Sequence, residues 1–108
     1  MAKAIARHIF ADDGAVEFVP VTAANRMTTL TSGKVDILIA TMSITDNRQM
    51  VVRFSTPYYI AGQAIMVKDS SQAKSLRDFR GKRLITVFGS TSERNLRTNV
   101  PDVEVAEP

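Results

Sequence analysis

The sequence predicts an α/β fold in which helices connect parallel strands. The 108 residues are 44% hydrophobic and 23% charged, a composition typical of a globular chain rather than a disordered one. Between residues 16 and 40, a strand-like pattern, a helical pattern and a second strand-like pattern follow one another. A similar succession begins after residue 72. A helix between two strands at this spacing connects a parallel pair through a right-handed crossover.

The first part of the chain, residues 1–68, alternates helical and strand-like patterns. Apolar residues at helical spacing predict helices, alternating β-branched residues predict a half-buried strand, and a nearly continuous apolar run predicts a strand covered on both faces. Thr22 is a suitable N-cap, and Ser32-Gly33 is a suitable helix end. The expected order is helix Ala2–Phe10, strand Val16–Val21, helix Ala23–Thr31, strand Val35–Ala40, short helix Asn47–Val51 and strand Gly62–Lys68.

A second unit, residues 69–108, is expected to begin at the polar stretch Asp69–Gln72. Its expected elements are a capped single-turn helix at Ser75–Gly81, a strand at Lys82–Phe88, a helix from Glu93 to about Thr98, and the start of a further strand at Val103–Val105. The domain boundary is therefore predicted between residues 68 and 69.

Several functional classes lack the residues that they need. The chain has no cysteine and one histidine, His8, so disulfides, thiolate zinc sites and cysteine nucleophiles are excluded. We expect no catalytic residues, no metal and no cofactor. The net charge is +3, and residues 68–97 hold eight basic and three acidic side chains. The two aromatics among them, Phe79 and Phe88, stand at core-like positions, which favours a solvated basic face over nucleic-acid binding.

A first candidate site follows the predicted strand at Val35–Ala40. Ligands of open α/β sheets bind beyond the carboxyl ends of the strands, where Thr41, Ser43 and Arg48 stand. The planar guanidinium of Arg48 suits a carboxylate or a phosphate, because two parallel N–H groups match two oxygens. In the alternative interpretation, Ser43 and Thr45 cap the next helix and Arg48 pairs with a surface acid.

A second candidate site lies in the same position relative to the strand at Lys82–Phe88. Ser90 and Thr91 precede a helix whose first backbone N–H groups attract anions. The alternative is an N-cap without a ligand. Arg26, one turn into a predicted helix, is either a further anion ligand or a solvated helix residue.

In their order and spacing, several stretches resemble the extracytoplasmic solute-binding proteins of bacterial polar amino-acid ABC transporters, family 3. The resemblance covers about residues 2–98. The stretches are Val16–Val21, Leu30–Asp36, Ala40–Arg48, Phe54–Tyr59 and Ser75–Thr91. The family implies a periplasmic-binding-protein-like (type II) doubly wound sheet, here with an incomplete first lobe and the start of the second.

The resemblance also implies site residues and a ligand. Arg48, assisted by Ser43 and Thr41, would bind the α-carboxylate of a free amino acid, and Ser90 and Thr91 would close on the same group from the second lobe. The Asn25-Arg26 pair is similar to that of acidic-amino-acid binders, in which the arginine meets the ligand's side-chain carboxylate. The implied ligand is therefore glutamate or aspartate, with a glutamine-like amino acid as the alternative. Ala23 replaces an aromatic residue of many members, so an aromatic clamp is not expected.

The implied function is non-enzymatic delivery of the amino acid to a membrane permease, in a periplasmic or otherwise extracytoplasmic location. Alternatives on the same fold are the ligand-sensing domain of a receptor and an enzyme like the cyclohexadienyl dehydratases. The resemblance further implies a fragment, because the family's first strand would precede Met1 and the distal half of the second lobe would follow. An unpaired sheet edge then favours dimers formed by strand exchange.

Overall fold

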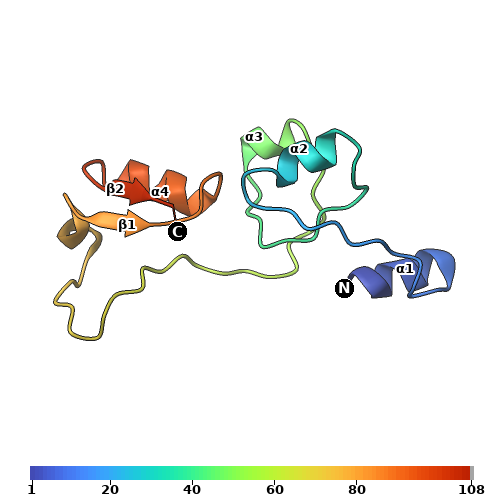
Figure 1. The fold of residues 1–108 in the computed structure, drawn as a ribbon, viewed down its shortest axis with the longest axis horizontal. Coiled ribbons are helices and arrows are strands. Elements are labelled where there is room, and N and C mark those ends of the chain that lie inside the picture. The colour runs from blue at the N-terminus through green and yellow to red at the C-terminus, as the bar shows by residue number, and fades with distance from the viewer. Residues whose placement is uncertain (108) are drawn as a thin grey trace. The chain divides into compact units, whose positions relative to one another are not determined.

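A computed structural model describes residues 1–107 of the chain. The described residues form two compact units, one comprising Met1–Thr41 and the other beginning at Met42. Figure 1 gives the order of the elements along the chain. The predicted lobe boundary between residues 68 and 69 concerns the family architecture and stays a prediction.

The first unit contains two helices, α1 (Ala2–Phe10) and α2 (Arg26–Thr31). The bounds of α1 are those predicted, and Ala6 on its apolar face is buried. After α2, Gly33 adopts a left-handed conformation with φ 76°. Its N–H donates to the Leu30 carbonyl, and the N–H of Lys34 donates to that of Thr29. This pair of hydrogen bonds is a Schellman motif, which ends the helix where the sequence predicts.

The helix α2 begins three residues later than the sequence predicts. The Thr22 N–H donates to Asn25 Oδ1 at 2.7 Å, and the Asn25 N–H donates to Thr22 Oγ1 at 3.3 Å. These reciprocal bonds hold residues 22–25 in a turn and satisfy donors that a helix start would leave unpaired. The pair Thr22 and Asn25 thus delays the helix to Arg26, with Asn25 at the N-cap position.

The second unit contains the only paired strands among the described residues. Strand β1 (Arg83–Ile85) runs parallel to β2 (Glu104–Ala106), and α4 (Thr91–Asn99) connects them. Figure 1 shows the two strands side by side next to this helix. Val100 and Val103, between α4 and β2, are the buried apolar residues of this unit. The strand–helix–strand order predicted for the second unit is confirmed.

Two short helices precede this sheet. Helix α3 (Asp46–Gln49) begins after Thr45, whose side chain accepts a hydrogen bond from the Arg48 N–H. The 3-10 helix η1 (Leu76–Phe79) has a capping box formed by Ser75 and Asp78. Backbone N–H groups of Lys74 and Ser75, and then the Ser75 hydroxyl, donate to the Asp78 carboxylate and hold its pKa below the ordinary value. Local capping signals therefore set both helix starts.

Three predicted strands are absent from the described residues. The structure assigns no strand to Val16–Val21, Val35–Ala40 or Gly62–Lys68, so these three local predictions are wrong. A strand is defined by its ladder of hydrogen bonds to a neighbour, and residue alternation carries no information on that neighbour. These stretches lie outside the one ladder that the structure contains.

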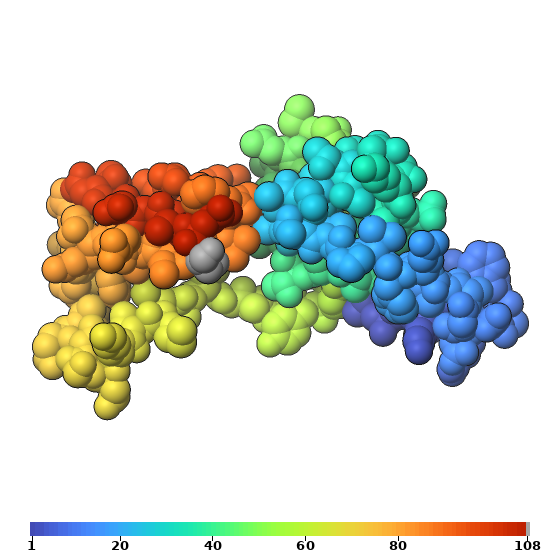
Figure 2. Space-filling view, in the orientation of Figure 1, coloured from blue at the N-terminus to red at the C-terminus, as the bar shows by residue number. Residues whose placement is uncertain are grey.

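Many large apolar side chains outside the regular elements are exposed. Ile60 and Met66 are 91% and 96% exposed. In Figure 2 the segment around residues 60–72, coloured yellow-green to yellow, stands away from the rest of the second unit over much of its length. No helix among the described residues is long and apolar enough to cross a bilayer. No group of three or more acidic, histidine or cysteine side chains there is placed to hold a metal ion.

Candidate functional site

Arg48 connects two loops that are distant in sequence. Its Nη1 donates to the Ser43 carbonyl at 2.8 Å, and its Nη2 donates to the Gly89 carbonyl at 3.2 Å. The side chain reaches these acceptors from α3, whose start is fixed by the Thr45 cap. One guanidinium thus holds the loop before α3 against the loop before α4. The planar guanidinium offers separate N–H donors on Nη1 and Nη2, so each carbonyl is bound by its own nitrogen.

Hydroxyl groups from the same two loops meet beside this arginine contact. Ser43 Oγ and Thr91 Oγ1 lie 3.2 Å apart, and either oxygen can donate to the other. The side chain of Gln63 also reaches the cluster, since its Nε2 donates to Thr91 Oγ1 at 3.0 Å. The structure therefore brings together Ser43, Arg48 and Thr91, three of the six residues predicted from sequence.

The loop before α4 is fixed through Gly89 and Glu93. Gly89 has φ 75°, and its N–H donates to Glu93 Oε2 at 3.0 Å. This backbone hydrogen bond and then the hydrogen bond from Arg97 hold the pKa of Glu93 below its ordinary value. Ser90, another predicted site residue, is the N-cap of α4, and its Oγ accepts from the Glu93 N–H at 3.2 Å.

The remaining predicted residues, Arg26 and Thr41, contact each other in the first unit. Arg26 Nη1 donates to the Thr41 carbonyl at 3.2 Å. The Arg26 side chain is not solvated as one sequence-based alternative had it, because the residue is only 8% exposed. Its Nε is buried without a hydrogen-bond partner among the described residues. A buried guanidinium N–H without an acceptor is costly, so this atom marks a place where an acceptor would be stabilising.

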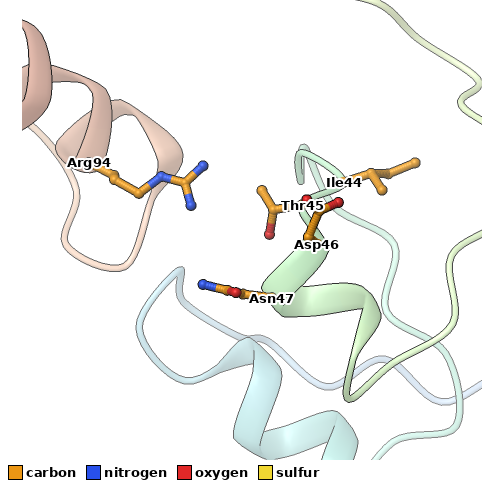
Figure 3. A pocket seen from close by; sticks show the side chains of 5 residues that line it. All are labelled: Ile44, Thr45, Asp46, Asn47 and Arg94. Carbon is orange, nitrogen blue, oxygen red and sulfur yellow. The ribbon is translucent and has the colours of Figure 1, made fainter.

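A shallow hollow of about 360 Å³ lies in the second unit between α3 and α4. Figure 3 shows Arg94 reaching from α4 toward Thr45 and Asn47 across this space. The five residues that line the hollow are Ile44, Thr45, Asp46, Asn47 and Arg94. The hollow adjoins in sequence the polar cluster, which is the group of Ser43, Arg48 and Thr91 with their contacts. The lining of the hollow begins one residue after Ser43. The six predicted residues are not part of the lining.

Two contributors to the polar cluster, Gln63 and Glu93, escaped the sequence analysis, and the part played by the Gly89 carbonyl was not predicted. Gln63 stands in a stretch that resembles a strand, Gly89 acts through its carbonyl oxygen, and Glu93 resembles an ordinary helix-surface acid. The one available signal was the glycine before the Ser90 cap, because a glycine there permits a positive φ. Gln63 had no local signal, since its partner Thr91 lies 28 residues away.

An α/β unit that gathers hydroxyl and guanidinium donors between two loops is typical of a ligand-binding protein. Comparison with known proteins identifies the family to which the chain belongs. Residues 1–103 match the model of the bacterial extracellular solute-binding proteins, family 3. The chain belongs to this family, which confirms the resemblance found in the sequence.

Two curated relatives are similar over nearly the whole chain. A glutamine-binding protein of Geobacillus stearothermophilus is 39% identical over 108 residues, which cover 99% of this chain and 41% of the relative. The ABC transporter glutamine-binding protein of Bacillus subtilis is also 39% identical, and the match covers 99% of this chain and 40% of that protein. The chain thus spans about two fifths of the length of these relatives.

Solved structures agree on the fold. An ancestral arginine-binding protein bound to arginine is 42% identical with a TM-score of 0.88, and the match covers 99% of this chain and 47% of that one. A cysteine-binding protein from Campylobacter jejuni is 34% identical with a TM-score of 0.85, over 98% of this chain and 43% of the other. The chain therefore has part of the type II periplasmic-binding-protein fold, as predicted.

Proposed function

We propose that this chain is part of an extracytoplasmic protein that binds a polar amino acid, with glutamate or aspartate preferred, for delivery to an ABC transporter permease. The observation that carries the proposal is the cluster of Arg48, Ser43 and Thr91, formed by two loops of a family 3 chain. Relatives and neighbours are named for different amino acids, including glutamine, arginine and cysteine. Their common feature is the amino-acid backbone, so a site for the α-carboxylate suits them all.

The donor chemistry of the cluster suits a carboxylate. Arg48 donates to two neutral carbonyl oxygens, at Ser43 and Gly89. A carboxylate is a stronger acceptor than a carbonyl, because the hydrogen bond is then between two charged groups. We expect the ligand's α-carboxylate to compete for this guanidinium, with the hydroxyls of Ser43 and Thr91 donating to its oxygens. Thr41 and Ser90, the other predicted hydroxyl residues, are assigned to the same group by family resemblance.

The preference for an acidic ligand depends on Arg26. Its guanidinium is buried, and its Nε has no hydrogen-bond partner among the described residues. A side-chain carboxylate would supply both the missing acceptor and the opposite charge. We assign Arg26 to the ligand's side-chain carboxylate on the resemblance of the Asn25-Arg26 pair to that of acidic-amino-acid binders. A relative of Rhodobacter capsulatus, 32% identical, is named for binding glutamate, glutamine, aspartate and asparagine.

The proposed mechanism is a ligand-dependent change in population between an open and a closed state, of which the permease recognises the closed one. A ligand shifts such an equilibrium only by its difference in affinity for the two states. Contacts that join the loop before α3 to the loop before α4 are suitable for this purpose, since the Arg48 side chain already contacts both. No catalytic step is included, in keeping with a family described as solute-binding proteins.

Isothermal titration calorimetry of the protein that carries this chain tests the proposal. Glutamate, aspartate, glutamine and arginine are titrated into the wild type, Arg48→Ala and Arg26→Ala, with Arg53→Ala as the control for an exposed arginine. We expect Arg48→Ala to weaken every ligand at least about tenfold, since it removes a charge-assisted contact. Arg26→Ala should weaken glutamate more than glutamine, and Arg53→Ala neither.

Two results would contradict the assignments. Equal affinity of the wild type and Arg48→Ala would show that the α-carboxylate binds elsewhere. Equal losses for glutamate and glutamine in Arg26→Ala would remove the basis of the acidic preference. Turnover of prephenate or arogenate by the wild type would favour the enzyme alternative. The extracytoplasmic location is tested separately, by fractionating cells that produce the tagged protein.

A further inference from the structure

Gln63 uses both ends of its side-chain amide in hydrogen bonds to α4. Its Nε2 donates to Thr91 Oγ1 at 3.0 Å, and its Oε1 accepts from Asn95 Nδ2 at 2.8 Å. Thr91 and Asn95 are four residues apart on α4 and so lie on one face of the helix. The extended segment that carries Gln63 is thereby attached to the first turns of this helix.

The Asn95 contact orients the Gln63 amide relative to Thr91. An amide has a donor end and an acceptor end, and the Asn95 NH₂ group donates to the acceptor end. The donor end of Gln63 is then left to face Thr91. A hydrophobic side chain at position 95 would leave the amide free to rotate by half a turn and offer its oxygen instead.

The Gln63 contact in turn decides what the Thr91 hydroxyl can do. A threonine hydroxyl has one proton to donate and lone pairs that accept. Because Thr91 Oγ1 accepts from Gln63, its own proton is directed away from Gln63, and accepting one hydrogen bond makes the hydroxyl a better donor. Ser43 Oγ lies 3.2 Å from Thr91 Oγ1, beside the Arg48 contact, and either oxygen of this pair can donate to the other.

We propose that Gln63 is a positioning residue that keeps the Thr91 hydroxyl a donor, so that the polar cluster presents donors to an anionic oxygen of the ligand. This inference rests on the proposed function and extends it to a residue outside the predicted site. The role is one of orientation, because the Gln63 amide itself contacts Thr91 and Asn95 rather than Ser43 or Arg48. The chain Asn95–Gln63–Thr91 is the unit that sets the direction of the proton.

A double-mutant cycle on ligand affinity tests this role. Gln63→Leu keeps the approximate size of the side chain and removes its donor and its acceptor. In the wild-type background we expect it to weaken the binding of glutamate about fivefold, the usual net effect of one hydrogen bond. In a Thr91→Val background, where there is no hydroxyl to orient, the same substitution should leave affinity unchanged. A merely structural role would give the same loss in both backgrounds.

Two further variants sharpen the comparison. Asn95→Leu removes the group that orients the amide, so it should weaken binding by less than Gln63→Leu and have no effect once Gln63 is leucine. Gln72→Leu, at an exposed glutamine of the same unit, is the matched control and should bind as the wild type does. Thermal unfolding of each variant, followed by circular dichroism, verifies that the compared proteins are folded.

The outcomes separate this inference from the proposed function. If the wild type bound no amino acid, or if Arg48→Ala bound as tightly as the wild type, the proposed function would be overturned and the inference with it. A protein that binds through Arg48 but tolerates Gln63→Leu would overturn only the role of Gln63. Equal losses from Gln63→Leu with threonine and with valine at position 91 would have the same meaning.

Discussion

Replacing Arg48 with lysine should measure what the two-loop contact contributes to stability. The arginine donates to the Ser43 carbonyl at 2.8 Å and to the Gly89 carbonyl at 3.2 Å. An ammonium group keeps the charge but lacks the planar fork, so we expect it to replace one contact and lose the other. Both contacts are near solvent, which places the net value of each at about 1 kcal/mol rather than at the upper end for charged groups.

The expected series is therefore graded. Arg48→Lys should lower the free energy of unfolding by about 1 kcal/mol and Arg48→Ala by about 2 kcal/mol. About 1 kcal/mol corresponds to roughly 4–8 °C in Tm for a unit of about 100 residues and to roughly 2–4 °C for a protein of about 150–250 residues. Urea unfolding followed by far-ultraviolet circular dichroism gives the first quantity, and a thermal scan gives the second.

The control is Arg53→Lys, at an exposed arginine four residues after the end of α3. This variant should unfold with the wild type. If Arg48→Lys and Arg48→Ala lost equal stability, the reasoning from two separate hydrogen bonds would be refuted. If both matched the wild type, the contact between the loops would contribute nothing in solution.

Three other perturbations follow from contacts described above, and one further test follows from the expected unpaired sheet edge. The lowered pKa of Glu93 means that its contribution to stability is complete above the ordinary value of 4.5 and is lost as the pH falls through the lower folded-state pKa. The difference in urea midpoint between the wild type and Glu93→Gln should accordingly shrink between about pH 6 and about pH 3, and a constant difference would contradict this assignment. Ser90→Ala removes the N-cap of α4 and should cost about 1 kcal/mol in urea unfolding, whereas Ser90→Thr should retain most of it. Arg26→Met removes a buried charge whose Nε is unpaired, but it also removes the hydrogen bond from Nη1 to the Thr41 carbonyl. The two effects oppose each other, so the stability without ligand should change by about 1 kcal/mol or less in thermal scans, and a larger loss would contradict this reasoning. The same variant should lose about tenfold in glutamate affinity by calorimetry. Dimers formed by strand exchange would appear as a concentration-dependent mass in light scattering, and a constant monomer mass would exclude them.

The parts of the fold that the sequence predicts well are those set by local contacts. The bounds of α1 follow from apolar spacing within nine residues, and the start of η1 follows from the side chain of Ser75. Helix α4 begins at Thr91, two residues before the predicted start at Glu93, because Ser90 is its N-cap. The strand predictions at Val16–Val21 and Val35–Ala40 are wrong because a ladder depends on a neighbour that the pattern does not encode. The parallel pair around α4 was recognisable because both of its strands lie close in sequence.

The candidate site divides in the same way. The positions of Ser43, Arg48 and Thr91 were predicted with help from the family resemblance, and the structure brings these three side chains or their loops into contact. Their binding of a ligand stays a proposal. Gln63 could not be predicted, because its role depends on a contact across 28 residues, and the glutamine itself stands in an ordinary apolar stretch.

The backbone of Gly89 is held on two sides, by Glu93 at its nitrogen and by Arg48 at its oxygen, with φ at 75°. A Cβ atom in that conformation would crowd the following carbonyl, at a cost of about 1–2 kcal/mol. The backbone cannot relax from this strain without releasing one of its two partners. Glycine is therefore the residue that this position tolerates best, because any other side chain would add this cost to a loop already bound at both ends.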